Sequence, residues 1–335
     1  MKEPQAAESG EDRLIARYFK PLATHPGAFG LLDDAAAIAP PPGCDLVLKT
    51  DGIVAGMHFF PDDPPDTVAR KALRVNLSDL AAKGASPLGF LLTLVLPLEI
   101  GDAWLAPFAR GLGSDAAHFA CPLFGGDTDR TTGPITISIA MFGAVPHGKM
   151  VRRAGASPGD RVVVTGTIGD AALGLILRRE RSTAARWGLA QEQQDHLMRR
   201  YLVPEPRIAI AEALRAHASA AMDVSDGLAG DLAKLCRVSG VATDIEVTRV
   251  PLSGGARAAL AKDPALIETI VAGGDDYEVL ACVPPDKLDA LRRQATAAGV
   301  AITDIGAVAA GQGQARFLDA RGQTLALAHP SFSHF

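Results

Sequence analysis

The sequence has few of the features that mark several common protein classes. Its four cysteines, Cys44, Cys121, Cys236 and Cys282, are far apart and form no C-x-x-C pair. This spacing argues against a zinc site or a disulfide framework. The longest apolar run, 87–97, is too short to span a bilayer, and residues 1–13 lack the apolar segment of a signal peptide. We therefore expect a cytoplasmic protein that does not enter a membrane.

The chain also lacks an excess of positive charge. Its formal net charge is -5 over 335 residues, so no global basic field favours nucleic acid as a partner. A bound anion would need local help from a metal ion or from backbone amides. Hydrophobic residues make up 48% of the chain and charged residues 21%. These proportions are typical of globular proteins, and the length leaves room for two domains.

Familiar motifs for nucleophilic or nucleotide chemistry are missing or incomplete. No cysteine has an obvious histidine partner in the sequence. The stretch 143–150 imitates a P-loop, but Met150 stands where the serine or threonine ligand of Mg²⁺ belongs. Gly311 and Gly313 lack the third glycine of a dinucleotide-binding fingerprint. We expect no covalent nucleophile, no P-loop and no Rossmann site.

Helical and strand patterns alternate in both halves of the chain. The first half predicts strands at 45–50, 89–96, 123–128 and 134–145, with helices at 67–84 and 102–119. We expect Asp51 at the end of the first strand and a glycine turn at the end of the third. The stretch 146–159, rich in glycine, proline and charge, marks a boundary. The second half predicts strands at 161–165, 243–247, 278–283, 302–308 and 315–318, with helices at 169–181, 208–217, 228–239 and 286–298. These patterns predict two α/β or α+β domains, 1–150 and 151–335.

The stretch 221–232, AMDVSDGLAGDL, concentrates three carboxylates, those of Asp223, Asp226 and Asp231. Gly227 gives the chain freedom to turn sharply, and Ser225 or Asp226 is expected to cap the helix that follows. Carboxylates this close together repel each other unless something positive lies between them. The alternative interpretation is a plain helix cap with solvated acids.

Further aspartates fall at predicted strand ends or in glycine turns. Their short carboxylates suit Mg²⁺, which usually combines one or two carboxylates with the phosphate oxygens of a substrate. Several such ions would let an acidic cleft bind a polyphosphate and offset its charge during phosphoryl transfer. Alternatively, each acid is a turn or cap residue. Calcium is disfavoured as the bound metal because no D-x-D-x-D-G loop is present. The full set is Asp33, Asp34, Asp51, Asp79, Asp127, Asp223, Asp226 and Asp275.

Five motifs occur in order along the chain: LDDAA at 32–36, NLSDLAAKGA at 76–85, GGDT at 125–128, MDVSDGL at 222–228 and GGDDYE at 273–278. Together they resemble the thiamine-monophosphate kinase family of the aminoimidazole-ribonucleotide synthetase-like superfamily, over nearly the whole chain. The resemblance implies a PurM-like fold of two α/β domains, with a homodimer formed through a β-barrel between N-terminal domains. It also implies direct in-line phosphoryl transfer from ATP to thiamine phosphate with several Mg²⁺ ions.

The same resemblance implies roles for individual residues. The Mg²⁺ ligands would be Asp34, Thr50, Asp51, Asp79, Asp127, Asp223 and Asp226. Contacts to ATP would come from Gly126, Asp127, Arg153 and Ser225. Contacts to thiamine phosphate would come from His58, Asp275 and Phe335, with Phe332 as the alternative aromatic.

The chain departs from the family pattern at four positions. Leu32 replaces a glycine, which predicts a different turn, and Lys49 replaces a hydroxyl residue beside a metal ligand. Asp275 replaces a glutamate, so water would bridge the shorter arm to the substrate. Ala109 replaces a tyrosine, so stacking on the nucleotide base would be lost. Two alternatives stay open: another ATP-using superfamily member, such as a selenophosphate synthetase or an aminoimidazole-ribonucleotide synthetase, and a nucleotide- or metal-binding regulatory protein without turnover.

Overall fold

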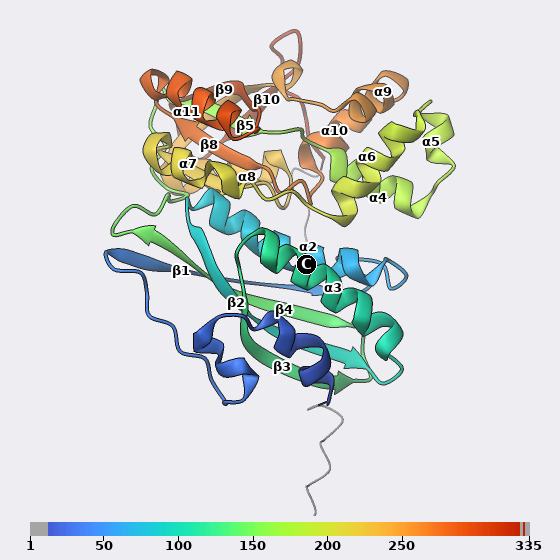
Figure 1. Cartoon of the computed structure of the whole chain (residues 1–335). Coiled ribbons are helices and arrows are strands. Elements are labelled where there is room, and N and C mark those ends of the chain that lie inside the picture. Colours follow the sequence, from blue (N-terminus) through green and yellow to red (C-terminus); the bar gives the residue numbers. More distant parts are fainter. Residues whose placement is uncertain (1–12, 329–330, 332–335) are drawn as a thin grey trace, which may run out of the picture. The chain divides into compact units, whose positions relative to one another are not determined.

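The computed structural model describes residues 13–328 and residue 331 (Figure 1). The chain folds into two compact units, and each contains helices and a β-sheet. Unit 1 holds the described residues up to 76 together with 87–144, and unit 2 holds 77–86 and the described residues from 145 onward. The predicted architecture of two α/β units is confirmed.

Unit 1 is built on a four-stranded sheet with the order β1-β4-β2-β3. Helices α2 and α3 lie along one face of this sheet (Figure 1) and bury Leu73 and Leu112. Three short helical segments, η1, η2 and η3, precede β1. The bounds are η1 Ile15–Phe19, η2 Lys20–Leu22, η3 Pro26–Leu31, β1 Cys44–Val54, α2 Pro65–Ala82, β2 Ser86–Pro97, α3 Asp102–His118, β3 Leu123–Thr131 and β4 Thr136–Pro146. Both predicted helices of this half are confirmed.

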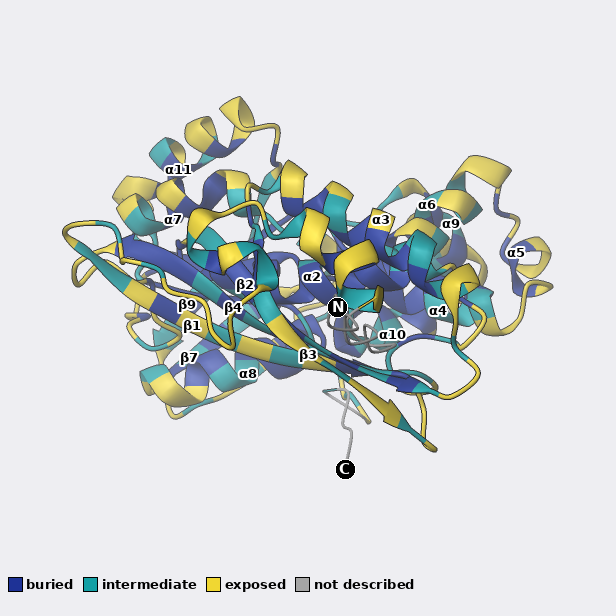
Figure 2. Ribbon diagram, turned by 60° about the horizontal axis from the view of Figure 1, so that its bottom comes forward, coloured by how far each residue is buried: buried dark blue, intermediate teal, exposed yellow. Residues whose placement is uncertain are grey.

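The edge strand β1 exposes apolar side chains. Leu46 and Leu48 are 42% and 68% exposed, whereas Val47, between them, is buried. In Figure 2, exposed residues alternate with better-covered ones along β1. An exposed edge strand with an apolar side is a template for pairing with another chain.

Two strands run further than the sequence predicts. Asp51 lies inside β1 rather than at its end, and β3 continues to residue 131, so the glycine turn expected near residue 126 is wrong. Gly126 instead pairs with Leu92 in the parallel β2–β3 ladder. A Cβ atom on Gly126 would lie 1.8 Å from the Leu92 carbonyl oxygen. Glycine is needed here for close approach of two backbones and not for a turn.

Unit 2 is a mixed six-stranded sheet with the order β10-β7-β9-β5-β8-β6. Strands β6 and β8 are buried along their whole length, as expected for strands covered on both faces. The strands are β5 Arg161–Thr165, β6 Ala220–Asp223, β7 Val241–Glu246, β8 Val279–Val283, β9 Ile302–Ala310 and β10 Ala315–Leu318.

Helices cover both faces of the unit 2 sheet. Val162 and Val164 of β5 join an apolar core with α4, α8 and α10, whereas Val163 joins a second core with α7 and α11. Helices α6 and α9 were not predicted, because the sequence of α6 is polar and that of α9 is rich in small residues. The helix predicted at 208–217 begins as a 3-10 turn, η4. The bounds are α4 Asp170–Arg179, α5 Thr183–Arg186, α6 Gln191–Leu202, η4 Ile208–Ile210, α7 Ala211–His217, α8 Leu228–Ser239, η5 Val247–Arg249, α9 Gly254–Lys262, α10 Leu266–Ala272 and α11 Pro285–Ala297.

Among the described residues, no helix has the length and apolar character needed to cross a membrane.

Asp170 makes the stability of unit 2 depend on pH. Its buried carboxylate accepts hydrogen bonds from Thr167 (2.6 Å) and Ser253 (2.5 Å) and lies 2.8 Å from the His196 ring. Burial acts to raise the pKa of Asp170, but these partners outweigh burial and lower it. A lowered carboxylate pKa stabilises the fold above the unfolded value of 3.8, and this stability is lost as the pH falls through the folded pKa.

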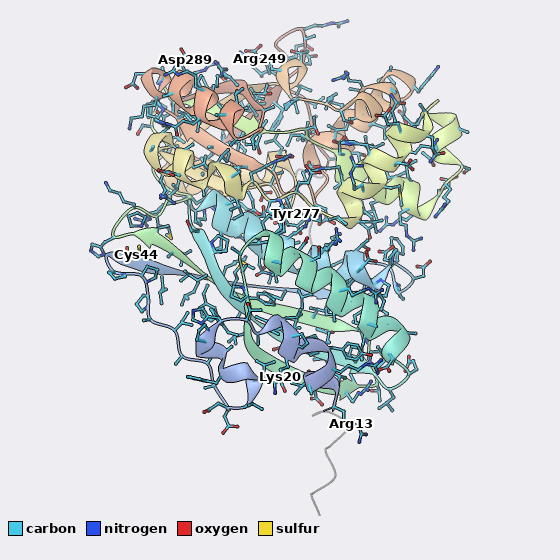
Figure 3. All side chains as sticks on the ribbon, viewed as in Figure 1. Arg13, Lys20, Cys44, Arg249, Tyr277 and Asp289 are labelled. Atoms are coloured by element: carbon cyan, nitrogen blue, oxygen red, sulfur yellow. The ribbon has the colours of Figure 1, made fainter. Side chains whose placement is uncertain are left out.

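We predict that Asp170→Asn lowers the free energy of unfolding by about 1–3 kcal/mol at pH 7, because buried donors lose a charged acceptor. In urea titrations at pH 7 and pH 3.5, the difference from the unsubstituted protein should shrink at the lower pH. The control is Asp289→Asn on α11, where the side chain is 82% exposed (Figure 3). An unchanged difference at both pH values would contradict the prediction.

Candidate active site

Unit 1 contains a cavity of about 640 Å³ between the loop after η3 and strands β2, β3 and β4. Asp34, Gly126 and Asp127 line it, so three predicted site residues of this unit come together. Thr128 adds a polar group and Phe142 belongs to the apolar wall. The size and the mixed lining are typical of a small-molecule site.

The other predicted residues of unit 1, Thr50, Asp51 and His58, are not among the residues that line this cavity. The Asp51 carboxylate lies 3.1 Å from the Lys49 ammonium group. The Nδ1 atom of His58 accepts the Val54 N–H at 3.0 Å, which fixes the ring against its own backbone. Thr50 is exposed on β1.

Unit 2 brings Asp79 near the end of β6, where Asp223 is 5% exposed. Ser78 forms a hydrogen bond with the Asp223 carboxylate. Burial, followed by the negative charges of Asp79 and Asp231, raises the pKa of Asp223 well above its ordinary value. A buried carboxylate in the field of a second one is stabilised by a nearby cation. This environment fits a hard divalent ion with oxygen ligands.

The loop after β6 and the loop before β8 are joined through their backbones. The Asp275 N–H donates to the Ser225 carbonyl at 2.9 Å, and the Tyr277 N–H donates to the Val224 carbonyl at 2.8 Å. Asp275 has a φ of 71° and Tyr277, which is labelled in Figure 3, has a φ of 51°. This region costs energy for residues other than glycine. Ser225 and Asp275, predicted for ATP and thiamine phosphate respectively, therefore lie side by side.

Glu278 anchors this strained loop to the core of unit 2. Its carboxylate is fully buried and accepts hydrogen bonds from Thr165 at 2.6 Å, Arg200 at 2.9 Å and Arg207 at 2.6 Å. Arg200 also donates to the Asp276 carbonyl at 2.8 Å. Sequence analysis missed this network; its signal was an acid directly before an apolar strand.

Helix α8 begins without the predicted side-chain cap. Its N-cap residue is Gly227, and neither Ser225 nor Asp226 caps the helix with its side chain. The hydrogen bonds run the other way, because the Asp231 carboxylate in the first turn accepts the N–H groups of Ser225 and Asp226, each at 2.9 Å. Two converging N–H donors form a site that favours an anionic acceptor.

Lys234 supplies the positive charge that the acidic stretch requires. Its ammonium group pairs with Asp226 and, at 2.8 Å, with Asp231. Desolvation acts to lower the pKa of Lys234, but its hydrogen bonds to both carboxylates outweigh this and raise it. The i,i+3 spacing of Asp231 and Lys234 on one helix was the signal that sequence analysis overlooked.

The remaining predicted residues are less constrained. Arg153 is exposed, and Phe332 and Phe335 lie outside the described residues. Ala109 is buried in α3, and Leu32 is 79% exposed. Across the described part of the chain, no three histidine, cysteine, aspartate or glutamate side chains form a group that could hold a metal ion.

Two family models match the chain. Residues 32–145 match the N-terminal domain of AIR synthase related proteins, and residues 157–319 match the C-terminal domain. The thiamine-monophosphate kinase of Caulobacter vibrioides is 43% identical over 325 residues, which is 96% of this chain and 90% of that protein. The Escherichia coli thiamine-monophosphate kinase is 39% identical, over 90% of this chain and 91% of that protein.

Solved structures give the same result. Thiamine-monophosphate kinase from Stenotrophomonas maltophilia superposes with a TM-score of 0.81 at 36% identity, over 94% of this chain and 96% of the other. AaThiL complexed with AMPPCP and TMP has a TM-score of 0.75 at 29% identity, over 92% and 97% of the two chains. The hydrogenase maturation protein HypE, with a TM-score of 0.78 at 19% identity, shares the fold alone.

The two ends of α8 provide a matched test of the close packing around the acidic loop. Gly227 has a φ of 103°, and a Cβ atom there would lie 2.5 Å from the Ala272 carbonyl group. Gly240 has a φ of 67° and nothing within 4 Å of such an atom. We predict that Gly240→Ala costs about 1–2 kcal/mol in free energy of unfolding and that Gly227→Ala costs clearly more. Equal losses in denaturant titrations would contradict the packing at Gly227.

Proposed function

Because the chain belongs to the thiamine-monophosphate kinase family of AIR synthase related proteins, we propose that it phosphorylates thiamine phosphate with ATP. The products are thiamine diphosphate and ADP. The observation that carries this proposal is identity of up to 43% with thiamine-monophosphate kinases over nearly the whole chain. The solved complex of AaThiL with AMPPCP and TMP, at 29% identity, supports ATP and thiamine phosphate as the substrate pair.

The rival functions have weaker support. Superfamily members that use ATP for other chemistry share the fold, as HypE does at 19% identity, but fold similarity at that level does not assign a reaction. A regulatory protein without turnover would draw support from the four departures in the family pattern. Three of them, Leu32, Lys49 and Ala109, lie in unit 1 and so outside the paired loops of unit 2.

Several Mg²⁺ ions are part of the proposal. When bound, they would bridge phosphate oxygens and offset the charge that develops during transfer. In unit 1, Asp34 and Asp127 line one cavity, and in unit 2 the charge of Asp79 acts on buried Asp223. Both pairs have the oxygen ligands that Mg²⁺ prefers. The proposed ligand set is Asp34, Thr50, Asp51, Asp79, Asp127, Asp223 and Asp226.

The protein's own part in the reaction is to bind and orient two phosphorylated molecules. Direct transfer needs no nucleophile from the protein, so positioning and charge stabilisation supply the catalysis. Gly126, Arg153 and Ser225 are the proposed ATP contacts, and the guanidinium fork of Arg153 suits phosphate oxygens. The backbone hydrogen bond from Asp275 to Ser225 holds one proposed contact for each substrate next to the other.

On the acceptor side, His58 and Asp275 are proposed to contact thiamine phosphate, together with Phe335 or Phe332. The Tyr277 hydroxyl donates to Asp275 at 3.3 Å and so holds the carboxylate in one orientation. Because this arm is short, a water molecule is expected to bridge it to the substrate.

A homodimer completes the proposal. The edge strand β1 exposes Leu46 and Leu48, and pairing of two such sheets into a β-barrel would cover both side chains. We place the protein in the cytoplasm, because all four cysteines are free thiols in the structure, as is usual in a reducing compartment.

The first prediction from the proposed function is the outcome of an assay of the purified protein. With ATP and Mg²⁺, ADP release should depend on thiamine phosphate and should not occur with free thiamine, because the acceptor is a phosphate group. Absence of turnover with thiamine phosphate would exclude the proposed function. Turnover with free thiamine would exclude the proposed acceptor.

The second prediction concerns Asp127→Asn and Asp223→Asn. Each should keep the fold but lower kcat by at least about 100-fold, because a transition-state charge loses its counter-ion. Asp289→Asn, on α11 in unit 2 (Figure 3), is the control and should keep normal turnover. Near-normal kcat in either test variant would remove that residue from the proposed ligand set.

The third prediction concerns Leu48→Asp. A charge on this 68% exposed side chain should prevent dimerisation, because a charge covered in an apolar interface loses its hydration. The mass measured by light scattering should fall from that of a dimer to that of a monomer. Val238→Asp, at a 48% exposed position on α8, is the control. A dimeric Leu48→Asp protein would show that β1 does not form the interface.

A further inference from the structure

Two of the proposed Mg²⁺ ligands form ion pairs with lysine residues of the protein itself. Lys49 lies 3.1 Å from Asp51, and Lys234 pairs with Asp226. The pair at Asp226 is the more constrained of the two, because its lysine also holds Asp231, which is fully buried.

The two oxygens of Asp231 have separate partners. One accepts the N–H groups of Ser225 and Asp226, and the other receives the Lys234 ammonium group at 2.8 Å. The side chain of Lys234 is 28% exposed and that of Asp226 is 34% exposed. Lys234 therefore spans a buried carboxylate, which it must neutralise, and a partly exposed carboxylate, which a metal ion can reach.

We propose that Lys234 is a built-in counter-ion that competes with Mg²⁺ for Asp226. An ion that uses the Asp226 carboxylate has to displace or repel the ammonium group, so it binds this loop weakly while no nucleotide is present. The phosphate oxygens of ATP then supply the further ligands that make binding favourable. This inference rests on the proposed role of Asp226 as a metal ligand. It adds that Lys234 limits the access of Mg²⁺ to Asp226 until a nucleotide is bound.

The test is divalent-ion binding to the full-length, nucleotide-free protein. Mn²⁺ is the probe, and the free ion is counted by its EPR signal. Lys234→Met should tighten Mn²⁺ binding roughly three- to fivefold, the size of effect that a partly exposed ion pair can produce. In thermal melting, Lys234→Met should be less stable than the unsubstituted protein in EDTA and should gain more from added Mg²⁺, because the metal replaces the missing charge.

Arg237→Met is the matched control. It removes one positive charge from an exposed position one turn further along α8 and should leave Mn²⁺ affinity unchanged. Lys234→Arg keeps the charge and should bind Mn²⁺ as weakly as the unsubstituted protein. If Lys234→Met does not fold, Lys234→Gln takes its place with the same expectation.

Two outcomes would overturn the proposal. The first is that Lys234→Met binds Mn²⁺ no more tightly than the unsubstituted protein does. If neither protein binds Mn²⁺ detectably, the two affinities count as equal. The other is a gain that persists when Asp226→Asn is added to Lys234→Met. Neither readout involves thiamine phosphate, so failure of the proposed kinase activity would be seen separately in the turnover assay.

Discussion

Crowding of negative charge at the start of α8 is the constraint on which the rest of unit 2 depends. Asp223, Asp226 and Asp231 fall within nine residues, and two of them are buried. Unpaired, such carboxylates would oppose folding. The structure accommodates them by giving Asp231 two backbone N–H donors and the Lys234 ammonium group. Asp223 has Ser78 as a hydrogen-bond partner and the charge of Asp79 beside it, which leaves it as the group that gains most from a bound cation.

The loop before β8, which is hydrogen-bonded to this acidic stretch, is strained. Asp275 and Tyr277 adopt positive φ, and the cost is offset by backbone bonds to the loop after β6 and by the buried anchor of Glu278, Arg200 and Arg207. Strain of this kind persists where the surroundings over-determine the conformation, as they commonly do at functional sites. The two loops therefore form one rigid support for Ser225 and Asp275.

The sequence predicted the elements with strong periodicity and missed features that depend on tertiary contacts. The leucines of α2 and the alternation in β4 indicated both elements with nearly correct bounds. Gly126 was wrongly assigned to a turn, because a glycine demanded by close approach to Leu92 looks the same in the sequence as one demanded by a turn. The helix cap was predicted wrongly for a similar reason. Ser225 or Asp226 was expected to accept from the helix, but their own N–H groups donate to Asp231. The sequence around Gly227 does not show which carboxylate accepts from which N–H.

The candidate site was predictable as a set of residues but not as an arrangement. The cavity of unit 1 gathers Asp34, Gly126 and Asp127, whereas Thr50 and His58 lie elsewhere on or after β1. Lys234 and Arg200 were missed because a lysine in a helix and an arginine in a polar stretch are ordinary surface residues in a sequence. Their importance follows from burial and from the acids they contact.

The most direct test of the central claim is a crystal structure of this protein with AMPPCP, Mg²⁺ and thiamine phosphate. The account predicts carboxylate oxygens of Asp127 and Asp223 at about 2.1 Å from Mg²⁺ ions that also contact the nucleotide phosphates. It would be contradicted by a nucleotide whose phosphates bind without metal contacts to either aspartate.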